Sequence, residues 1–371
     1  MNVKFSAPKE NLLYGINAVQ KAISAKNTVP ILSGIYLKAQ GGRLTFAATD
    51  LEISIECTVP ALIISEGDIV LPGRYFAELT RRLPEGEVIF EYQPDSVSMK
   101  ITYENAESSI KGWKGEEFPT ISQINGDKSI AIIPSEFKNL VKQTTFCANK
   151  DDVRPVFTGA LLEVENNQLK MVSTDSYRLS FKAGAIQNPD SCSFQKVVPV
   201  KALEELSRIL KDDDEDLLHI TYNQNQMSFS NSEIHFNTRL IDSNYPDYRR
   251  VIPSEHQTLI KFKKRSLQNT IDRATLFSSE KDGTNVIKIK IEDENINITS
   301  QSDYGKIDEN LPIYQDGENL SIAFNAKYLT DAFKTMDYED LQATFCGSLG
   351  AAVFTGLNDD SYLYLILPLR S

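Results

Sequence analysis

The sequence predicts an α+β protein made of three repeats of about 125 residues, each with antiparallel sheets and two helices. Three observations support this prediction. Hydrophobic residues make up 41% of the 371-residue chain, which is enough for folded cores. Two sequence elements recur at one period. Apolar residues alternate in some segments, as in strands, and have helical spacing in others. Because such a repeat has the size of a domain, we expect domains over residues 1–125, 126–253 and 254–371.

The first recurring element is a stretch that runs from a proline to an aspartate. Pro30-Ile31-Leu32-Ser33-Gly34 is followed by Asp50, and Pro155-Val156-Phe157-Thr158-Gly159 is followed by Asp175, with 20 residues from Pro to Asp in both copies. A fainter third copy runs from Val286 to Asp303. The two aspartates could be catalytic carboxylates. However, active sites rarely recur in every repeat, whereas turns do, so we interpret both as turn residues.

The second recurring element is a helix. It begins at Leu71-Pro72-Gly73-Arg74, at Val198-Pro199-Val200-Lys201 and at Phe324-Asn325-Ala326-Lys327. In each copy apolar residues follow the basic residue at +2, +5 and +9, which is one face of a helix, and Pro or Asn suits the helix start. Each repeat therefore reads as helix, strands, helix, strands. The first helices are expected over residues 9–26, 135–150 and 263–281.

Charge is distributed unevenly along the chain. The net charge of −12 argues against a surface that coats nucleic acid as a whole and against binding to anionic membranes. Yet the six expected helical windows carry 19 basic and nine acidic residues, while the remainder carries 20 and 42. Helix propensity does not explain this, because Glu favours helices as much as Lys does and is scarce in these windows. Net-basic helices of three similar domains could share one surface that binds phosphates without reading base sequence. The windows are 9–26, 72–82, 135–150, 199–211, 263–281 and 325–337.

Groups that carry catalysis or bind metals are scarce. His219, His235 and His256 lie far apart, the four cysteines form no CxxC pair, and no glycine-rich nucleotide loop is present. The acidic run 211–216 lacks the Gly and the Glu that a calcium loop needs. We therefore expect no catalytic residues, no metal and no cofactor. The first residues lack the apolar stretch of a signal peptide, so we expect a cytoplasmic protein.

Three segments resemble the bacterial DNA sliding clamp family, the β subunit of DNA polymerase III. They are Thr174-Asp175-Ser176-Tyr177-Arg178-Leu179, the stretch from Tyr245 to Pro253 (YPDYRRVIP), and the stretch from Tyr364 to Arg370 (YLILPLR). The resemblance covers the whole chain. It implies a ring formed by a head-to-tail homodimer, with sheets outside and helices lining the hole. Such a ring encircles double-stranded DNA, slides on it, and tethers the replicative polymerase, the clamp loader and other proteins with a clamp-binding motif, without catalysis of its own.

The resemblance also implies three sets of functional residues. A groove would take Leu or Phe side chains of partner peptides into apolar pockets, while arginines and backbone groups fix the peptide. Arg154 is the DNA candidate that remains where relatives can have aromatic contacts, since Pro155 follows it here. The groove residues are Phe157, Thr174, Tyr177, Arg178, Leu179, Pro246, Arg250, Val251, Ile366, Leu367, Pro368 and Leu369; the DNA-binding residues are Lys26, Arg74, Arg81, Lys138, Lys142, Lys150, Arg154, Lys201, Arg208 and Lys264; the dimer-interface residues are Leu276, Phe277, Ser108 and Ile110.

Two other functions remain open from the residues alone. The chain could be an enzyme that acts on DNA or nucleotides, which the scarcity of catalytic groups disfavours. It could also be an interaction scaffold without a DNA role, which the basic helices disfavour. Without the resemblance, Leu179, Val251 and Leu367 would be interpreted as ordinary core residues, and Arg178 as a charge at the rim of that core. With it, we expect substitutions of Arg178 and Pro246 to weaken peptide binding without unfolding the protein.

Overall fold

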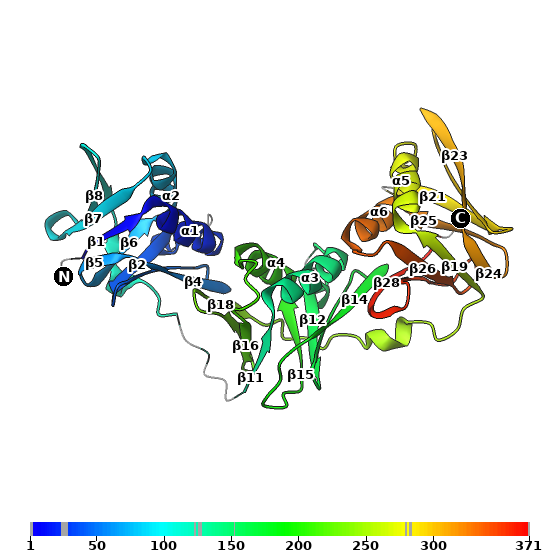
Figure 1. Ribbon diagram of the computed structural model, residues 1–371, viewed down its shortest axis with the longest axis horizontal. Coiled ribbons are helices and arrows are strands. Elements are labelled where there is room, and N and C mark those ends of the chain that lie inside the picture. The colour runs from blue at the N-terminus through cyan, green and yellow to red at the C-terminus, as the bar shows by residue number, and fades with distance from the viewer. Residues whose placement is uncertain are drawn as a thin grey trace. The chain divides into compact units, whose positions relative to one another are not determined.

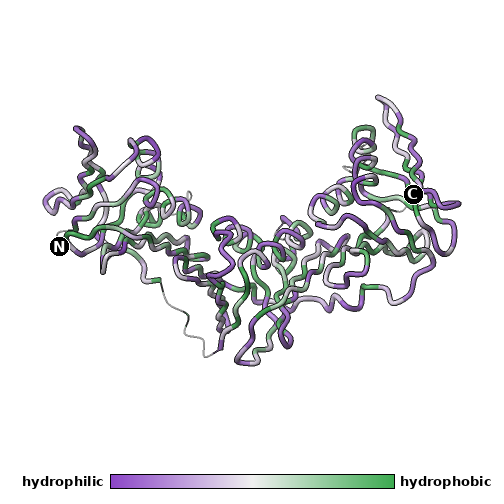
Figure 2. Tube along the Cα trace, viewed as in Figure 1, coloured by the Kyte–Doolittle hydropathy of each residue, from purple (hydrophilic) through white to green (hydrophobic). Residues whose placement is uncertain are grey.

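The computed structural model describes residues 3–23, 29–121, 124, 128–151, 153–278, 280–281 and 284–369 (Figure 1). The chain forms two compact units. The first comprises Met1–Ser135, Gln187–Cys192 and Lys201–Leu240; the second comprises Glu136–Ile186, Ser193–Val200 and Ile241–Ser371. Hydrophobic residues are concentrated along the strands, and hydrophilic residues dominate the connections between them (Figure 2). Each unit is described by itself.

The described residues form six α-helices, one at each predicted place. After α1 and α3 the chain continues as single turns of 3-10 helix, so the predicted windows 9–26, 135–150 and 263–281 are too long. At the end of α3 the hydroxyls of Thr144 and Thr145 donate to the carbonyls of Leu140 and Val141, at 2.6 and 2.9 Å, and such bonds weaken the regular helix. The helices are α1 (Lys9–Val19), α2 (Gly73–Arg82), α3 (Pro134–Thr144), α4 (Val200–Ile209), α5 (Lys264–Thr275) and α6 (Ala326–Thr335).

The shorter helices reduce the charge contrast without removing it. Within the observed bounds the six helices carry 13 basic and seven acidic residues, against 19 and nine in the predicted windows. Lys21 and Lys150 are among the basic residues that lie beyond the helix ends. The prediction that the helices carry a net positive charge is therefore confirmed, although the charge is smaller than predicted.

The first unit contains a five-stranded sheet, in the order β5-β1-β7-β8-β9, and a nine-stranded sheet, in the order β10-β6-β2-β3-β4-β18-β17-β16-β11. All their pairings are antiparallel. The strands are β1 (Lys4–Pro8), β2 (Gly34–Gln40), β3 (Arg43–Thr49), β4 (Ile53–Pro60), β5 (Leu62–Ser65), β6 (Gly67–Pro72), β7 (Glu87–Gln93), β8 (Ser98–Tyr103), β9 (Ala106–Lys111), β10 (Trp113–Lys114), β11 (Ser129–Ile132), β16 (Leu218–Tyr222), β17 (Gln226–Ser230) and β18 (Ile234–Arg239).

The second unit repeats this plan. Its nine-stranded sheet has the order β15-β12-β13-β14-β28-β27-β26-β19-β24, and its other sheet runs β20-β21-β22-β23, with β25 paired to β21. The predicted antiparallel sheets are thus confirmed in both units. The strands are β12 (Gly159–Glu165), β13 (Gln168–Thr174), β14 (Arg178–Ala185), β15 (Phe194–Pro199), β19 (Thr258–Lys263), β20 (Glu280–Lys281), β21 (Thr284–Glu292), β22 (Asn295–Ser302), β23 (Gly305–Pro312), β24 (Tyr314–Gly317), β25 (Leu320–Asn325), β26 (Asp340–Phe345), β27 (Ala352–Gly356) and β28 (Asp359–Ile366).

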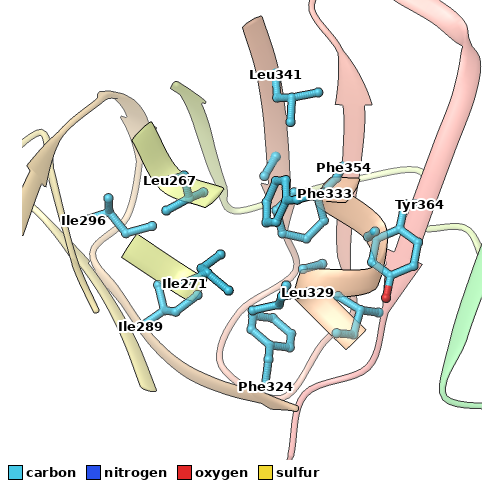
Figure 3. Packing of buried hydrophobic residues seen from close by; sticks show 14 of the residues in the cluster. Leu267, Ile271, Ile289, Ile296, Phe324, Leu329, Phe333, Leu341, Phe354 and Tyr364 are labelled. Atoms are coloured by element: carbon cyan, nitrogen blue, oxygen red, sulfur yellow. The ribbon is translucent and has the colours of Figure 1, made fainter. Parts of the chain in front are cut away.

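The helices cover one face of the sheets and leave the other face uncovered by helices (Figure 1). In the first unit Phe46 of β3 points at α1, where a Cβ on Gly15 would lie 2.3 Å from its ring, so glycine allows this close packing. In the second unit α5 and α6 lie side by side, and Ile271 and Leu329 pack into one buried cluster with Ile289 of β21 (Figure 3). These cores hold the helices against the sheets.

The aspartates of the first recurring element close equivalent turns. Asp50 Oδ1 accepts the backbone N–H groups of Glu52 and Ile53 at 3.0 and 2.8 Å. Asp175 Oδ1 accepts those of Tyr177 and Arg178, both at 3.0 Å. This Asx-type bonding confirms that both aspartates are turn residues.

The same two turns share their backbone conformation. Leu51 and Ser176 occupy the equivalent position with φ of 75° and 78°. The third copy differs, because Ser302 pairs with Gly305 across a tight hairpin between β22 and β23. The fainter sequence match at Asp303 thus corresponds to a different turn.

Candidate peptide-binding and DNA-binding surfaces

The segments that resemble sliding clamps meet on the second nine-stranded sheet, on the face away from α3. The Ser180 hydroxyl donates to the carbonyl of Gln143 in α3 at 2.5 Å, so the neighbouring Leu179 points to the opposite face. On that face a cluster, here called the outer cluster, is buried beneath the 3-10 helix Tyr248–Val251 and not beneath an α-helix. Its fully buried members are Leu161, Val172, Leu179, Val197, Tyr248, Val353 and Leu365, and its half-buried members include Val156, Phe181, Ile241, Tyr245, Ile252 and Leu363.

The predicted groove residues surround this outer cluster. Ile366 is the exception, because it is buried on the opposite face in the cluster that contains Ile271 of α5 and Leu329 of α6. Leu179 is buried in the outer cluster, and Phe157 packs edge-on against Tyr245 with ring centroids 6.3 Å apart. The Thr174 hydroxyl closes its turn by donating to the carbonyl of Arg178 at 2.7 Å. These residues supply the floor and the sides of the surface, not its exposed contacts.

The exposed groove residues are mostly apolar or aromatic. Tyr177, Val251 and Leu367 leave 63%, 55% and 42% of their surface open to solvent. The Leu367 N–H donates to the carbonyl of Tyr177 at 2.9 Å, which holds the two side by side. Pro246 and Arg250 are exposed, and Pro368 and Leu369 are half-buried. The structure therefore brings most of the predicted set together around a buried apolar floor, with Ile366 and Arg178 as the exceptions.

Arg178 is not a rim charge. It is 8% exposed, and its guanidinium donates to Asp175 Oδ2, Asp331 Oδ2 and the carbonyl of Phe146, each at 3.0 Å. The Tyr328 ring lies 4.3 Å from the guanidinium carbon. The interpretation as a rim charge is wrong because these partners enclose the cation. The sequence does not show this, because Asp331 lies 153 residues away from Arg178. Arg178 positions the 174–178 turn, so its substitution should affect stability as well as binding.

Sequence reasoning missed the pair of Glu163 and Arg249. Arg249 Nη2 donates to both carboxylate oxygens of Glu163 at 2.7 and 2.6 Å, and the Tyr248 hydroxyl donates to Oε2 at 3.0 Å. Burial raises the pKa of the Glu163 carboxyl, but the bonds from Arg249, Gln195 and Tyr248 outweigh it and leave the pKa below its ordinary value. A glutamate between Leu162 and Val164 in the apolar strand 159–165 was the available signal, because a buried carboxylate requires a partner.

The basic helix residues fall into two groups. Arg74 of α2, Lys201 of α4 and Lys150 after α3 are exposed and form no hydrogen bond or ion pair with a described residue. Arg81, Lys142, Arg208 and Lys264 do form such bonds, to Glu78, Asp337, Glu205 and the carbonyl of Met336. Lys138 is half-buried, and Lys26 lies outside the described residues.

Arg154 belongs to the outer-cluster side. Its guanidinium carbon lies 5.9 Å from the Phe157 ring centroid, and Nη1 donates to the Ser176 hydroxyl at 3.4 Å. Phe157 and Ser176 flank the predicted groove. The structure thus places this DNA candidate beside the predicted peptide contacts.

The predicted dimer-interface residues lie on or beside edge strands. Ser108 and Ile110 are half-buried on β9, the last strand of its sheet. Leu276 is 76% exposed after α5, and Phe277 packs on Gly305 at the start of the edge strand β23. Edge strands present unpaired backbone groups that can pair with another chain.

No cluster of three or more His, Cys, Asp or Glu side chains in the described ranges is arranged to hold a metal ion. Nor does the part of the chain that the structure describes contain a helix that is long and apolar enough to cross a membrane.

Comparison with known proteins decides the family. Residues 3–122, 131–247 and 249–370 match models of the N-terminal, central and C-terminal domains of the DNA polymerase III beta subunit. The chain belongs to this family of bacterial DNA sliding clamps. The resemblance and the predicted fold of three clamp domains are thereby confirmed. Members of this family are non-catalytic processivity factors, which agrees with the expectation that the chain is not an enzyme.

Individual sliding clamps match along their whole length. The chain is 34% identical over 380 residues to the beta sliding clamp of Bacillus subtilis and 32% identical over 379 residues to that of Staphylococcus epidermidis, with full coverage of both chains. The crystal structure of the Bacillus subtilis DNA polymerase sliding clamp aligns with a TM-score of 0.95 at 33% identity, covering 100% of each chain. The DnaN sliding clamp of Pseudomonas aeruginosa bound to griselimycin aligns at 0.93 and 25%, also with 100% coverage of each chain.

Proposed function

We propose that this processivity clamp acts as a closed homodimeric ring in the cytoplasm, with domains over residues 1–125, 126–253 and 254–371. A closed ring stays on DNA because it does not open, so its phosphate contacts can be weak and sequence-independent and still permit sliding. A polymerase tethered to the ring gains effective concentration at the primer end. The observation that carries the proposal is the exposed apolar surface over the outer cluster, which fits a tethering peptide.

The peptide surface consists of contact residues and supporting residues. Tyr177, Val251 and Leu367 would contact the apolar side chains of a partner peptide, and the exposed Arg250 would reach its polar groups. Phe157, Thr174 and Leu179 would shape the pockets. The clamp loader and other proteins with a clamp-binding motif would use the same surface.

Ring closure would join β9 of one protomer to β23 of its partner. Both are edge strands in their own sheets, and Leu276 and Phe277 beside β23 offer apolar contacts to Ser108 and Ile110 on β9. A head-to-tail contact of this kind uses two different surfaces and closes into a ring when its rotation permits.

The experiment that tests the clamp is sedimentation of the pure protein, free and with a synthetic QLxLF-type peptide. We expect a particle near twice the 41.6 kDa chain mass that binds the peptide. A monomer that ignores the peptide would contradict both the ring and the peptide surface.

The DNA contacts are tested by charge reversal. Arg74→Glu, Lys150→Glu and Lys201→Glu together should slow loading onto nicked circular DNA by roughly tenfold or more, because each removes a phosphate contact. A filter-binding assay of loaded clamp measures this effect. The matched control is Lys290→Glu on β21, outside the helices, and peptide binding should be unchanged in both proteins. Unchanged loading of the triple variant would refute the assignment.

A further inference from the structure

The first nine-stranded sheet contains a counterpart of the peptide surface with different chemistry. The pairing register aligns the cross-strand row Val197, Leu161, Val172, Phe181 and Leu363 of the second sheet with Val70, Tyr36, Ala47, Glu56 and His235 of the first. The apolar floor of one sheet is thus replaced by a row with a phenol, a carboxylate and an imidazole in the other.

A cavity of about 630 Å³ lies over the part of this row formed by Tyr36, Ala47 and Glu56. Its charged and aromatic lining side chains include Tyr36, Lys38, Glu56, Asp68, Lys114 and Phe118. Its volume lies within the range of small-ligand sites. The Tyr36 ring stacks on Phe118 with centroids 5.2 Å apart, and the Tyr36 hydroxyl donates to Asp68 Oδ2 at 3.2 Å. An aromatic wall with a carboxylate at its edge is therefore built into the cavity.

The acidic groups of the cavity are not fully neutralised. Lys114 pairs with Glu116 at 3.6 Å. Lys38 is then the other lysine of the lining, and it faces two carboxylates, Glu56 and Asp68. Glu56 is half-buried and makes no hydrogen bond or ion pair with a described residue. Burial raises the pKa of its carboxyl, and the nearby Lys38 lowers it by less. A cationic donor would satisfy the Glu56 carboxylate.

The second sheet shows which cation fits such a place. There the linker supplies Arg249, whose guanidinium bonds Glu163 and lies 4.7 Å from the Tyr248 ring, while the Tyr248 hydroxyl donates to the same carboxylate. The first sheet also holds a tyrosine–carboxylate pair, Tyr36 and Asp68, but at other register positions, because Lys38 stands opposite Asp68 where Glu163 stands opposite Gln195. The described start of the linker, residues 115–121, contributes side chains to the cavity lining and contains no arginine. The tyrosine–carboxylate arrangement is thus present without its guanidinium.

We propose that this cavity binds an arginine side chain presented by an extended segment of a partner protein. The planar guanidinium would donate to Glu56 and Asp68 and lie against the Tyr36–Phe118 wall. The cavity is much larger than a guanidinium, so neighbouring residues of the segment would fill the remainder. This site is separate from the peptide surface, which lies on the other sheet.

The test uses the full chain and two small probes, N-acetyl-arginine amide and its neutral isostere N-acetyl-citrulline amide. Saturation-transfer NMR measures their binding. We expect the arginine probe to bind and the citrulline probe to bind about tenfold more weakly, because hydrogen bonds between charged groups are the stronger kind. Glu56→Gln should weaken the arginine probe by a similar factor. The matched control Glu104→Gln, an exposed turn carboxylate of the same domain, should have no effect.

Three results would overturn the proposal. The first is equal binding of the arginine and citrulline probes. The second is unchanged arginine binding in both Glu56→Gln and Asp68→Asn, with circular dichroism showing that both variants are folded. The third is displacement of the arginine probe by the QLxLF-type peptide, which would place the probe on the other sheet. Simultaneous binding of both ligands supports two separate sites.

Discussion

The two nine-stranded sheets share a plan but differ in the chemistry of their outer faces. In the first, β6-β2-β3-β4-β18 follow the order that β15-β12-β13-β14-β28 follow in the second. The row that contains Leu179, Leu365 and Val353 in the second sheet contains Ser54, Asn237 and Ser228 in the first. One fold therefore supports an apolar surface in one copy and a polar one in the other.

The comparison teaches that the proposed tethering surface does not follow from the fold alone. Both sheets carry the same Asx turn at Asp50 or Asp175, yet the turn residue that enters the sheet is Ile53 in one and Arg178 in the other. The side chains on the outer face, such as Leu179 in the second sheet and the equivalent Ser54 in the first, decide whether that face is apolar. Predictions that exchange or remove these side chains test that conclusion.

The largest effect is expected at the second-sheet turn. Arg178→Ala removes a buried cation and leaves Asp175 and Asp331 without their shared partner. Removing one side of a buried ion pair costs about 3–5 kcal/mol, so urea denaturation should show a loss of that size. Arg250→Ala, at an exposed arginine, should change stability by less than about 0.5 kcal/mol. Equal stabilities of the two variants would show that the Arg178 network does not hold the turn.

A smaller effect is expected at the exposed contacts. Val251→Ser and Leu367→Ser should each weaken binding of a fluorescent QLxLF-type peptide by about tenfold, because apolar anchors carry most of such binding energy. Fluorescence anisotropy measures the affinity. The control is Leu51→Ser, an equally exposed leucine at the first-sheet turn (52% exposed), which should leave the affinity unchanged. A loss in the control and not in the other two would reverse the assignment of the two sheets.

A third effect concerns the dependence of stability on pH. The pKa of Glu163 is lowered in the folded state, so its contribution is present above the ordinary glutamate pKa and is lost as pH falls through the folded value. Glu163→Gln should therefore cost about 1–3 kcal/mol at pH 7 and less below pH ~4. Thermal unfolding at several pH values measures this. Lys38→Gln, at the register-equivalent position of the first sheet, should show no such pH-dependent loss.

The local pattern predicts much of this molecule. The repeat of proline-to-aspartate stretches predicts the two Asx turns, because Asp50 and Asp175 bond to residues two and three positions away. The helix starts at Gly73 and Ala326 follow from their local spacing. Features that depend on neighbouring residues in the chain can be predicted from the sequence.

Features set by distant partners are not readable in this way. Arg178 looks like a surface charge until Asp331 is placed beside it, and Glu163 has no visible partner until Arg249 folds over the sheet. The end of α3 depends on the hydroxyls of Thr144 and Thr145 competing for carbonyls, which the apolar period does not report. Which basic residues are already paired, such as Lys142 with Asp337, also depends on tertiary contacts.

The pairing of β14 with β28 would give the proposed peptide surface a mechanical role. A partner bound at Tyr177 and Leu367 pulls on side chains that sit directly at the end of this five-residue ladder, which runs from Arg178 opposite Ile366 to Lys182 opposite Tyr362. Force from a moving polymerase would therefore load the ladder from its end, where the hydrogen bonds break one after another. The bond from Arg178 to Asp331 resists the first step of this peeling, and the bond from Lys182 to Ser361 resists the last.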